Sequence, residues 1–250
     1  MPDRAQTAKR VARGGEVFTA VSQAVLVCGF AGRLSPVARG RLLTLGTSCR
    51  FRPGELLLRE GEVSNHVLLL THGRVKLTST ADNGYAVVLG ILGPGDLVGE
   101  MAGLGGHPRT ATVVALDPVL ARFISGSDFR SFIDGERGAG IALAELIASR
   151  LRDANRRCLE FGAFPVRRRL ALILLDLDRW HGVSAPGDGN LRDINLALSQ
   201  ADLAGLVGSS LESVAKAIRN LVRQGVIRTR RRHVTILDRA ALAELANKSP

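Results

Sequence analysis

The chain has 250 residues, of which 46% are hydrophobic, and it carries a formal net charge of +11 at pH 7. This apolar fraction excludes wholesale disorder, and the length allows one large domain or two of ordinary size. The three cysteines are scattered along the chain, which excludes a disulfide framework and a CxxC metal site and indicates a reducing, cytoplasmic setting. The positive charge favours a polyanionic partner, either nucleic acid or an anionic membrane.

Residues 1–27 are predicted to form an N-terminal extension. The first 16 residues are polar and basic, and we expect them to be loose. An apolar run over residues 17–30 follows basic residues, as in a secretory signal. Polar residues interrupt this run, no small-residue cleavage site follows it, and it is too short to span a bilayer. We therefore interpret it as a packed or amphipathic helix and expect no membrane partner.

The region from about Arg50 to Ser125 shows short alternating runs separated by turn residues. Residues 74–79 alternate between polar and apolar side chains, the sequence Asp82-Asn83-Gly84 is a strong hairpin turn, and an apolar run follows over residues 86–92. Many short strands at this spacing predict an antiparallel barrel or jelly roll. We place this β-domain at residues 28–135.

One segment of the β-domain combines a carboxylate, a guanidinium and a hydroxyl. Gly99-Glu100-Met101-Ala102 is followed after a Gly-rich stretch by Pro108-Arg109-Thr110. An arginine makes charge-assisted, bidentate bonds to phosphate, and glycines let backbone N–H groups approach an anion. Glu100 has no base beside it, so it is better suited to accept bonds from ribose hydroxyls than to catalyse. The segment predicts a site for a small molecule with a phosphate and a sugar.

The sequence offers no catalytic or metal-binding set. No nucleophile, base and orienting group stand together, the carboxylates are not paired, and the five histidines share no ligand spacing. We therefore predict that the protein is not an enzyme and holds no metal or cofactor.

A long helix is predicted over residues 136–163. Small and apolar side chains recur there at alternating steps of three and four: Ala144, Ile147, Leu151, Ala154, Cys158 and Phe161. This heptad pattern fits either a parallel homodimer seam or an amphipathic helix packed on its own domain, and periodicity alone leaves both open. Cys158 is interpreted as a small core residue of the seam.

A proline ends this helix and marks a domain boundary near residue 164. Pro165 cannot continue the helix, a second helical run follows over residues 167–180, and a Gly/Pro/Asp-rich loop is predicted over residues 182–190. The last domain therefore covers residues 164–250.

Residues 200–218 meet the requirements of a helix-turn-helix. Gly208 can adopt the left-handed conformation that ends a first helix, Ser209 with Glu212 predicts a capping box for the second, and Ser199 with Asp202 predicts a similar cap for the first. Ala204 is small where the two helices cross. The shared core consists of Leu203, Val207, Val214 and Ile218.

Charge favours DNA binding over an ordinary helical hairpin. Between Glu212 and Arg232 one acidic residue faces seven basic ones, which suits contacts to phosphates. A recognition helix from about Ser210 is expected to enter a major groove, and residues 228–236 are predicted to form the wing of a winged helix. The candidate DNA-binding residues are Ser209, Ser210, Leu211, Glu212, Ser213, Lys216, Arg219 and Arg231.

Together, these three parts in this order resemble the bacterial cyclic-AMP receptor protein (Crp/Fnr) family over about residues 28–240. The resemblance implies an α+β fold with a cyclic-nucleotide-binding β-roll, a dimerisation helix and a winged helix-turn-helix. It implies a homodimeric transcription regulator that binds double-stranded DNA, with RNA polymerase as a further partner. Ligand binding at the dimer helix is expected to reorient the DNA-binding domains.

The resemblance also assigns roles to single residues. It implies that Glu100 holds the ribose hydroxyl, that Arg109 and Thr110 hold the cyclic phosphate, and that backbone groups of residues 99–102 line the pocket. The base-contacting positions correspond to Ala154 and Asn155. The family's cyclic-AMP receptors usually have threonine in place of Ala154, and a hydroxyl such as that of Thr110 accompanies cyclic-GMP preference in eukaryotic relatives. We expect cyclic AMP as effector, with cyclic GMP as the alternative.

The recognition helix also departs from the family pattern. The family's sequence commonly begins Ser-Arg-Glu-Thr-Val, whereas this chain has Leu211 in place of the arginine that reads a guanine. We expect a changed half-site, because losing a bidentate arginine removes about 1–3 kcal/mol of base discrimination. Two alternatives remain: a regulator that binds DNA without ligand, and a nucleotide-binding interaction module that does not bind DNA.

Overall fold

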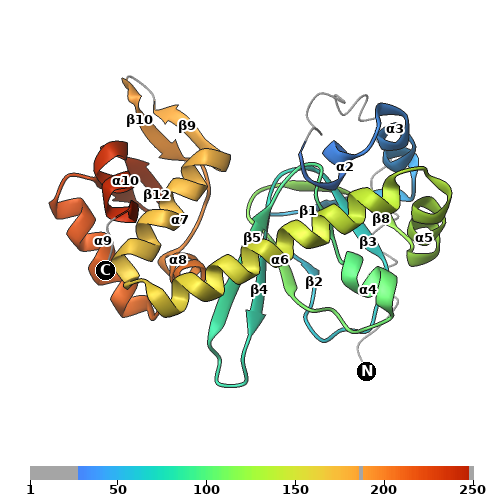
Figure 1. Cartoon of the computed structure of the whole chain (residues 1–250), viewed down its shortest axis with the longest axis horizontal. Helices are drawn as coiled ribbons and strands as arrows, with labels where there is room; N and C mark the ends of the chain where they lie inside the picture. Colours follow the sequence, from blue (N-terminus) through green and yellow to red (C-terminus); the bar gives the residue numbers. More distant parts are fainter. Residues whose placement is uncertain (1–27, 186–187, 248–250) are drawn as a thin grey trace. The chain divides into compact units, whose positions relative to one another are not determined.

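A computed structural model describes residues 28–185 and 188–247 (Figure 1). The chain divides into two compact units, which we call the N-terminal unit (residues up to 79, with 91–150) and the C-terminal unit (80–90, with 151 onward). The expected N-terminal extension and most of the expected helix at 17–30 lie outside the described residues. The domain boundaries predicted from the sequence stay predictions.

The N-terminal unit is built on two four-stranded sheets. One has the order β1-β8-β3-β6 and the other β2-β7-β4-β5. Residues 80–90, which include the first five residues of β5, group with the C-terminal unit. The strands are β1 Thr47–Phe51, β2 Leu56–Leu58, β3 Val67–His72, β4 Val75–Thr80, β5 Ala86–Leu92, β6 Leu97–Val98, β7 Thr112–Ala115 and β8 Val119–Ile124. They confirm the expected β-domain. The hairpin turn is also confirmed, with Gly84 at a φ of 80°.

Strand β3 separates two hydrophobic cores. Successive side chains of a strand point to opposite faces, so Leu68 and Leu70 join the core between the sheets, while Val67 and Leu69 face a second core under the helices. All four side chains are at most 1% exposed. The second core is closed by α2 Gly29–Arg33, α3 Pro36–Thr44, α5 Gly126–Gly135 and the start of α6 Ala139–Ala163.

Polar side chains set the starts of these helices. Ser35 accepts a hydrogen bond from the backbone N–H of Ala38 at 3.1 Å, and Ser125 accepts one from Asp128 at 3.0 Å. Both satisfy N–H groups that have no partner inside their helix. The predicted long helix is confirmed by α6, which is followed by a break at Phe164-Pro165.

The C-terminal unit surrounds helix α7, which confirms the second predicted helical run. Its sheet has the order β11-β12-β10-β9. Buried Asp178 joins α7 to two other elements, because its carboxylate pairs with Arg192 at 2.8 Å and Arg239 at 3.0 Å. The elements are α7 Val166–His181, β9 Gly182–Ala185, β10 Asp188–Ile194, α8 Gln200–Val207, α9 Leu211–Arg223, β11 Ile227–Arg230, β12 His233–Ile236 and α10 Arg239–Asn247 (Figure 1).

The prediction of a loop over residues 182–190 is wrong for most of that segment. Strands β9 and β10 pair antiparallel there, and Arg192 of β10 lies opposite Ile236 of β12. Local composition gave a turn signal but no strand signal, because the partner of β10 is more than 40 residues away in the sequence. Long-range pairing decides this segment.

Candidate functional site

The expected phosphate-binding segment forms a tight turn followed by a short helix. Gly99 adopts a φ of 84°, and α4 Glu100–Gly105 begins directly after it. A Cβ atom at position 99 would collide with Nη1 of Arg109 and would lie 3.0 Å from Leu58. Glycine is therefore required here for both its conformation and its lack of a side chain.

Arg109 is buried beside this turn with its guanidinium held by three acceptors. Its side chain donates from Nε to Ser64 Oγ at 2.9 Å, from Nη1 to the Gly99 carbonyl at 2.8 Å and from Nη2 to the His66 carbonyl at 2.7 Å. Arg109 is only 3% exposed. A guanidinium has five N–H donors, so these described contacts leave two donors for another anion or acceptor. The arrangement fixes the plane of the fork.

Glu100 is also buried, 3% exposed, and is paired with Arg150, a residue outside the predicted site. Arg150 of α6 donates to Glu100 Oε1, and its second nitrogen donates to the Leu97 carbonyl at 2.7 Å. Its distance of fifty positions from Glu100 gave no signal for the pair.

The surroundings of Arg109 shift the pKa values of two basic side chains, Arg109 itself and His66. Burial lowers the pKa of Arg109, while the charges of Glu62 and Glu100 raise it in part. His66 stacks on Phe123 with ring centroids 4.4 Å apart, and burial together with the charge of Arg109 lowers its pKa to about 4. His66 is therefore neutral at pH 7, which avoids a second cation beside the guanidinium.

The other candidate ligand residues are spread over both units. Ala102 is buried in α4, whereas Met101 and Thr110 are exposed on the N-terminal unit. Asn155 and Ala154 belong to the C-terminal unit, where both are exposed on α6. The structure therefore brings Gly99, Glu100 and Arg109 together within one unit.

Some residues of the heptad pattern on α6 are exposed, whereas others pack against the rest of the protein. Leu151 is 60% exposed, and Ala144, Ala154 and Cys158 are exposed as well. Ile147 instead packs against the core under the helices. Phe161, which was assigned to the seam, packs against Gly208 in the C-terminal unit, where its ring would lie 2.7 Å from an added Cβ. The exposed members leave an apolar stripe on α6.

Helices α8 and α9 form the expected helix-turn-helix. Ser199 and Asp202 make the predicted capping box, with bonds of 3.1 and 2.9 Å, and Gly208 ends α8 at a φ of 63°. The prediction of a second capping box, formed by Ser209 and Glu212, is wrong. Ser210 caps α9 instead, by accepting a hydrogen bond from Ser213 at 3.2 Å. The helix starts one residue later than a box at Ser209 requires.

Helix α9 presents a buried face and a polar face. The predicted core residues Leu203, Val207, Val214 and Ile218 are all at most 4% exposed. Ser209 is half-buried at the turn. The remaining candidate DNA-binding residues are exposed: Ser210, Leu211, Glu212, Ser213, Lys216, Arg219 and Arg231.

The predicted wing is the hairpin of β11 and β12. Its turn lies at Arg231 and Arg232, and Arg232 adopts a φ of 56°. The basic side chains of residues 228 and 230–232 are exposed, while Ile236 is buried and Val234 half-buried. A groove lined by Gln200, Ile218 and Thr229 separates the wing from the helices. The arrangement places cations on both the helix and the wing.

The described residues were also compared with the requirements of a metal site and of a membrane-spanning helix. Within residues 28–185 and 188–247, no group of three His, Cys, Asp or Glu side chains is arranged to hold a metal ion. The helices of that same part of the chain are all too short or too polar to cross a membrane.

Comparison with known proteins identifies both regions. Residues 48–136 match the model of the cyclic nucleotide-binding domain, and residues 168–245 match that of the Crp-like helix-turn-helix domain. The CRP-like cAMP-activated global transcriptional regulator of Mycobacterium tuberculosis is 30% identical over 196 residues, covering 78% of this chain and 86% of that protein. The cyclic AMP receptor protein of Thermus thermophilus is 31% identical over 193 residues, covering 77% and 85%.

Structural comparison gives the same result. The solved structure of a CRP/FNR-family transcriptional regulator from Thermus thermophilus aligns with a TM-score of 0.68 at 25% identity, covering 81% of this chain and 100% of that one. The chain belongs to the CRP/FNR family of transcription regulators. It is a DNA-binding regulator rather than an enzyme, and its α+β fold is the one expected from the sequence.

Proposed function

We propose that this protein is a homodimeric, cyclic-AMP-responsive regulator that binds a specific operator sequence. The observation that carries the proposal is that Arg109 and Glu100 are both buried beside the Gly99 turn, inside a cyclic nucleotide-binding domain. The printed names of two relatives, which describe a cAMP-activated regulator and a cyclic AMP receptor, support cyclic AMP as the ligand. Cyclic GMP is the competing ligand.

Each candidate residue has a role in this proposal. The two remaining donors of Arg109, together with the Thr110 hydroxyl and backbone groups of residues 99–102, bind the cyclic phosphate. Glu100 accepts from the ribose hydroxyl while Arg150, which donates to Oε1, holds its carboxylate in place. Asn155 offers an amide to the purine edge. Ala154 lacks a hydroxyl, so we expect one base contact fewer than in a threonine-bearing receptor.

The dimer interface follows from the exposed apolar stripe on α6. Leu151, Ala154 and Cys158 are spaced by three and four residues, and an exposed leucine on such a stripe is covered when two copies pair in parallel. A two-fold dimer presents two copies of α9 to successive major grooves, about 34–36 Å apart. The operator is therefore expected to be a near-palindrome.

DNA recognition is assigned to the exposed residues of α9 and the wing. Glu212 and Lys216 read base edges, Leu211 contacts a thymine methyl group, and Arg219 and Arg231 bind phosphates. RNA polymerase is the expected further partner, and the cytoplasm the expected location.

The first experiment is calorimetric titration of the full chain with cyclic AMP and cyclic GMP. We expect micromolar or tighter binding of cyclic AMP, and a loss of at least 100-fold in Arg109→Lys, which keeps the charge but loses the planar fork. Thr110→Ala provides a second variant at an exposed position, with an expected loss of about tenfold. Arg231→Ala is the matched control, because it removes an arginine far along the chain from the nucleotide-binding domain.

The second experiment selects an operator from a random duplex pool and measures its affinity with and without nucleotide. Lys216→Ala should weaken operator binding and leave the nucleotide affinity unchanged. Operator binding that no nucleotide alters would favour the ligand-independent regulator, which Ala154 supports. Nucleotide binding without any retention of DNA at physiological salt would favour the interaction module.

A further inference from the structure

The loop between β2 and β3 holds Arg109 by both its backbone and its side chain. The backbone N–H of Gly61 donates to the Arg109 carbonyl at 2.8 Å, and the Arg109 N–H donates to the Glu62 carbonyl at 2.9 Å. The side chain of Arg109 donates from Nε to Ser64 and from Nη2 to His66, which belong to the same loop. The β2–β3 loop therefore fixes where residue 109 lies and also how its guanidinium is turned.

Ser64 differs from the other two acceptors of this guanidinium. Gly99 and His66 offer backbone carbonyls, which do not depend on residue type, whereas Ser64 offers the hydroxyl oxygen of its side chain. This oxygen accepts from Nε, the nitrogen that joins the guanidinium to the rest of the side chain, at 2.9 Å. Because the Nε–H bond lies in the plane of the guanidinium, the contact limits rotation of the whole fork about the Cδ–Nε bond.

Two glycines approach the backbone that follows Ser64. A Cβ atom added at Gly103 of α4 would lie 3.2 Å from the Asn65 carbonyl oxygen, and one added at Gly126 of α5 would lie 2.6 Å from it. Both helices therefore come close to the loop at places where a larger residue would push its backbone away. The Ser64 hydroxyl is thus presented from a closely packed segment.

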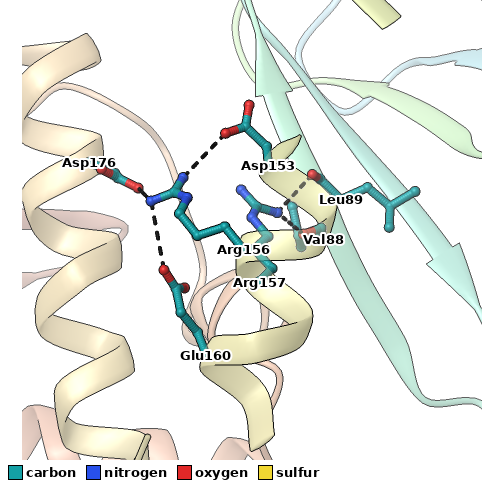
Figure 2. A network of polar contacts seen from close by, with 7 residues as sticks. All are labelled: Val88, Leu89, Asp153, Arg156, Arg157, Glu160 and Asp176. Carbon is teal, nitrogen blue, oxygen red and sulfur yellow. Dashed lines mark hydrogen bonds and ion pairs between the residues drawn. The ribbon is translucent and has the colours of Figure 1, made fainter. Parts of the chain in front are cut away.

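Arg156 of α6 shows a different way of fixing an arginine. Its guanidinium pairs with Asp176 at 3.2 Å, with Asp153 at 3.5 Å and with Glu160 at 3.7 Å (Figure 2). These partners are carboxylates, so they compensate the positive charge that they hold. The three acceptors that bind the side chain of Arg109 are uncharged oxygens, so they orient the guanidinium without an ion pair. Its remaining N–H groups can then make charge-assisted bonds to an anion.

We propose that Ser64 is a positioning residue of the nucleotide site, whose hydroxyl fixes the plane of the Arg109 guanidinium so that its two remaining N–H groups meet the phosphate in one orientation. This inference rests on the proposed function, because it takes a cyclic phosphate as the ligand of Arg109. A fork that is already oriented loses less conformational freedom when the ligand binds, which raises the affinity. It also distinguishes the two exocyclic oxygens of a cyclic phosphate, since they point in different directions from the ring.

The two phosphorothioate diastereomers of cyclic AMP test this orientation, because each has sulfur in place of a different exocyclic oxygen. Sulfur is a weaker hydrogen-bond acceptor than oxygen. In calorimetric titration the unmodified full chain is therefore expected to bind one diastereomer at least tenfold more tightly than the other. In Ser64→Ala the affinity for cyclic AMP should fall at least fivefold, and the ratio between the diastereomers at least threefold. A merely structural role would lower all the affinities alike and leave the ratio unchanged.

Two further variants control this experiment. Val63→Ala is the matched control, since Val63 precedes Ser64 in the loop and is 78% exposed, and it should change the ratio less than twofold. Ser64→Thr keeps a hydroxyl and should bring the ratio back to within twofold of the unmodified chain. An unchanged ratio in Ser64→Ala, an equal fall in Val63→Ala, or equal binding of both diastereomers by the unmodified chain would overturn the proposal.

Nitrogen-15 NMR of the ligand-free chain observes the contact itself. The Nε–H proton of Arg109 is expected to exchange with water at least tenfold faster in Ser64→Ala than in the unmodified chain, and less than twofold faster in Val63→Ala. If the unmodified chain binds neither cyclic AMP nor cyclic GMP, the proposed function fails, and this comparison still decides whether Ser64 holds the guanidinium. Equal exchange in Ser64→Ala and in the unmodified chain would show that it does not.

Discussion

Arginine lies in opposite environments in the two units. Arg109 is buried, and the acceptors around it fix its guanidinium in one plane. Arg230 and Arg231 at the wing are exposed. A fixed, desolvated fork suits one small anion at one place, whereas mobile, hydrated cations suit a long polyanion whose phosphates lie at many places. Residue type alone therefore does not distinguish the two proposed anion sites, whereas the burial of the side chain does.

The largest expected effect is on the stability of the N-terminal unit. Arg109→Met removes a buried guanidinium and leaves the carbonyls of Gly99 and His66 without this donor, so we expect the free energy of unfolding to fall by about 3–5 kcal/mol. Arg231→Ala should change it by less than about 0.5 kcal/mol, because that side chain is exposed. Urea unfolding followed by far-ultraviolet circular dichroism measures both. Equal losses in the two variants would contradict the contrast between the sites.

A pH dependence should accompany the buried site. The folded pKa of His66 is about 4, below its ordinary value of 6.5, so the unfolded chain takes up a proton between these values that the folded chain does not. Stability is therefore expected to fall as the pH drops from about 6.5 to 4, by up to about 3 kcal/mol.

His66→Phe is the control for this effect, since it keeps the stacking on Phe123 and removes the titrating group. The pH dependence of unfolding in this variant should lack the His66 contribution. The single tryptophan, Trp180, lies in the C-terminal unit, so circular dichroism is a better probe of the N-terminal unit than fluorescence. A variant with the same pH dependence as the unmodified chain would show that His66 already titrates normally.

The smallest effect is expected at the wing. Arg231→Ala should weaken operator binding by about tenfold at low salt and reduce the slope of log affinity against log salt by about 1, because one phosphate contact is lost. Its nucleotide affinity should not change. Fluorescence anisotropy over a series of salt concentrations measures the slope, and an unchanged slope would mean that Arg231 does not contact phosphate.

Local signals in the sequence predicted the parts of the structure that depend on neighbours in the chain. Gly99, Glu100 and Arg109 stand within eleven positions, and the capping box of Ser199 and Asp202 spans four, so residue type together with spacing predicted that each set lies together. The N-cap at Ser210 was misplaced by one residue, because two consecutive serines satisfy the same cap pattern.

Contacts between distant parts of the chain were not predictable in this way. Ser64 and His66 reach Arg109 from more than 40 positions away, and Arg150 reaches Glu100 from fifty. The acceptors at His66 and Gly99 are backbone carbonyls, which every residue type offers. The strands β9 and β10 were missed for a similar reason, since β10 depends on pairing with β12.

The double burial of β3 has a consequence for how the N-terminal unit unfolds. Leu68 and Leu70 belong to one core and Val67 and Leu69 to the other, so four consecutive residues of one strand serve both cores. Neither core can be hydrated while β3 stays in place, and removing β3 opens both. The sheets and their covering helices should therefore melt in one cooperative transition, and slow amide exchange in β3 should report the global unfolding of the unit.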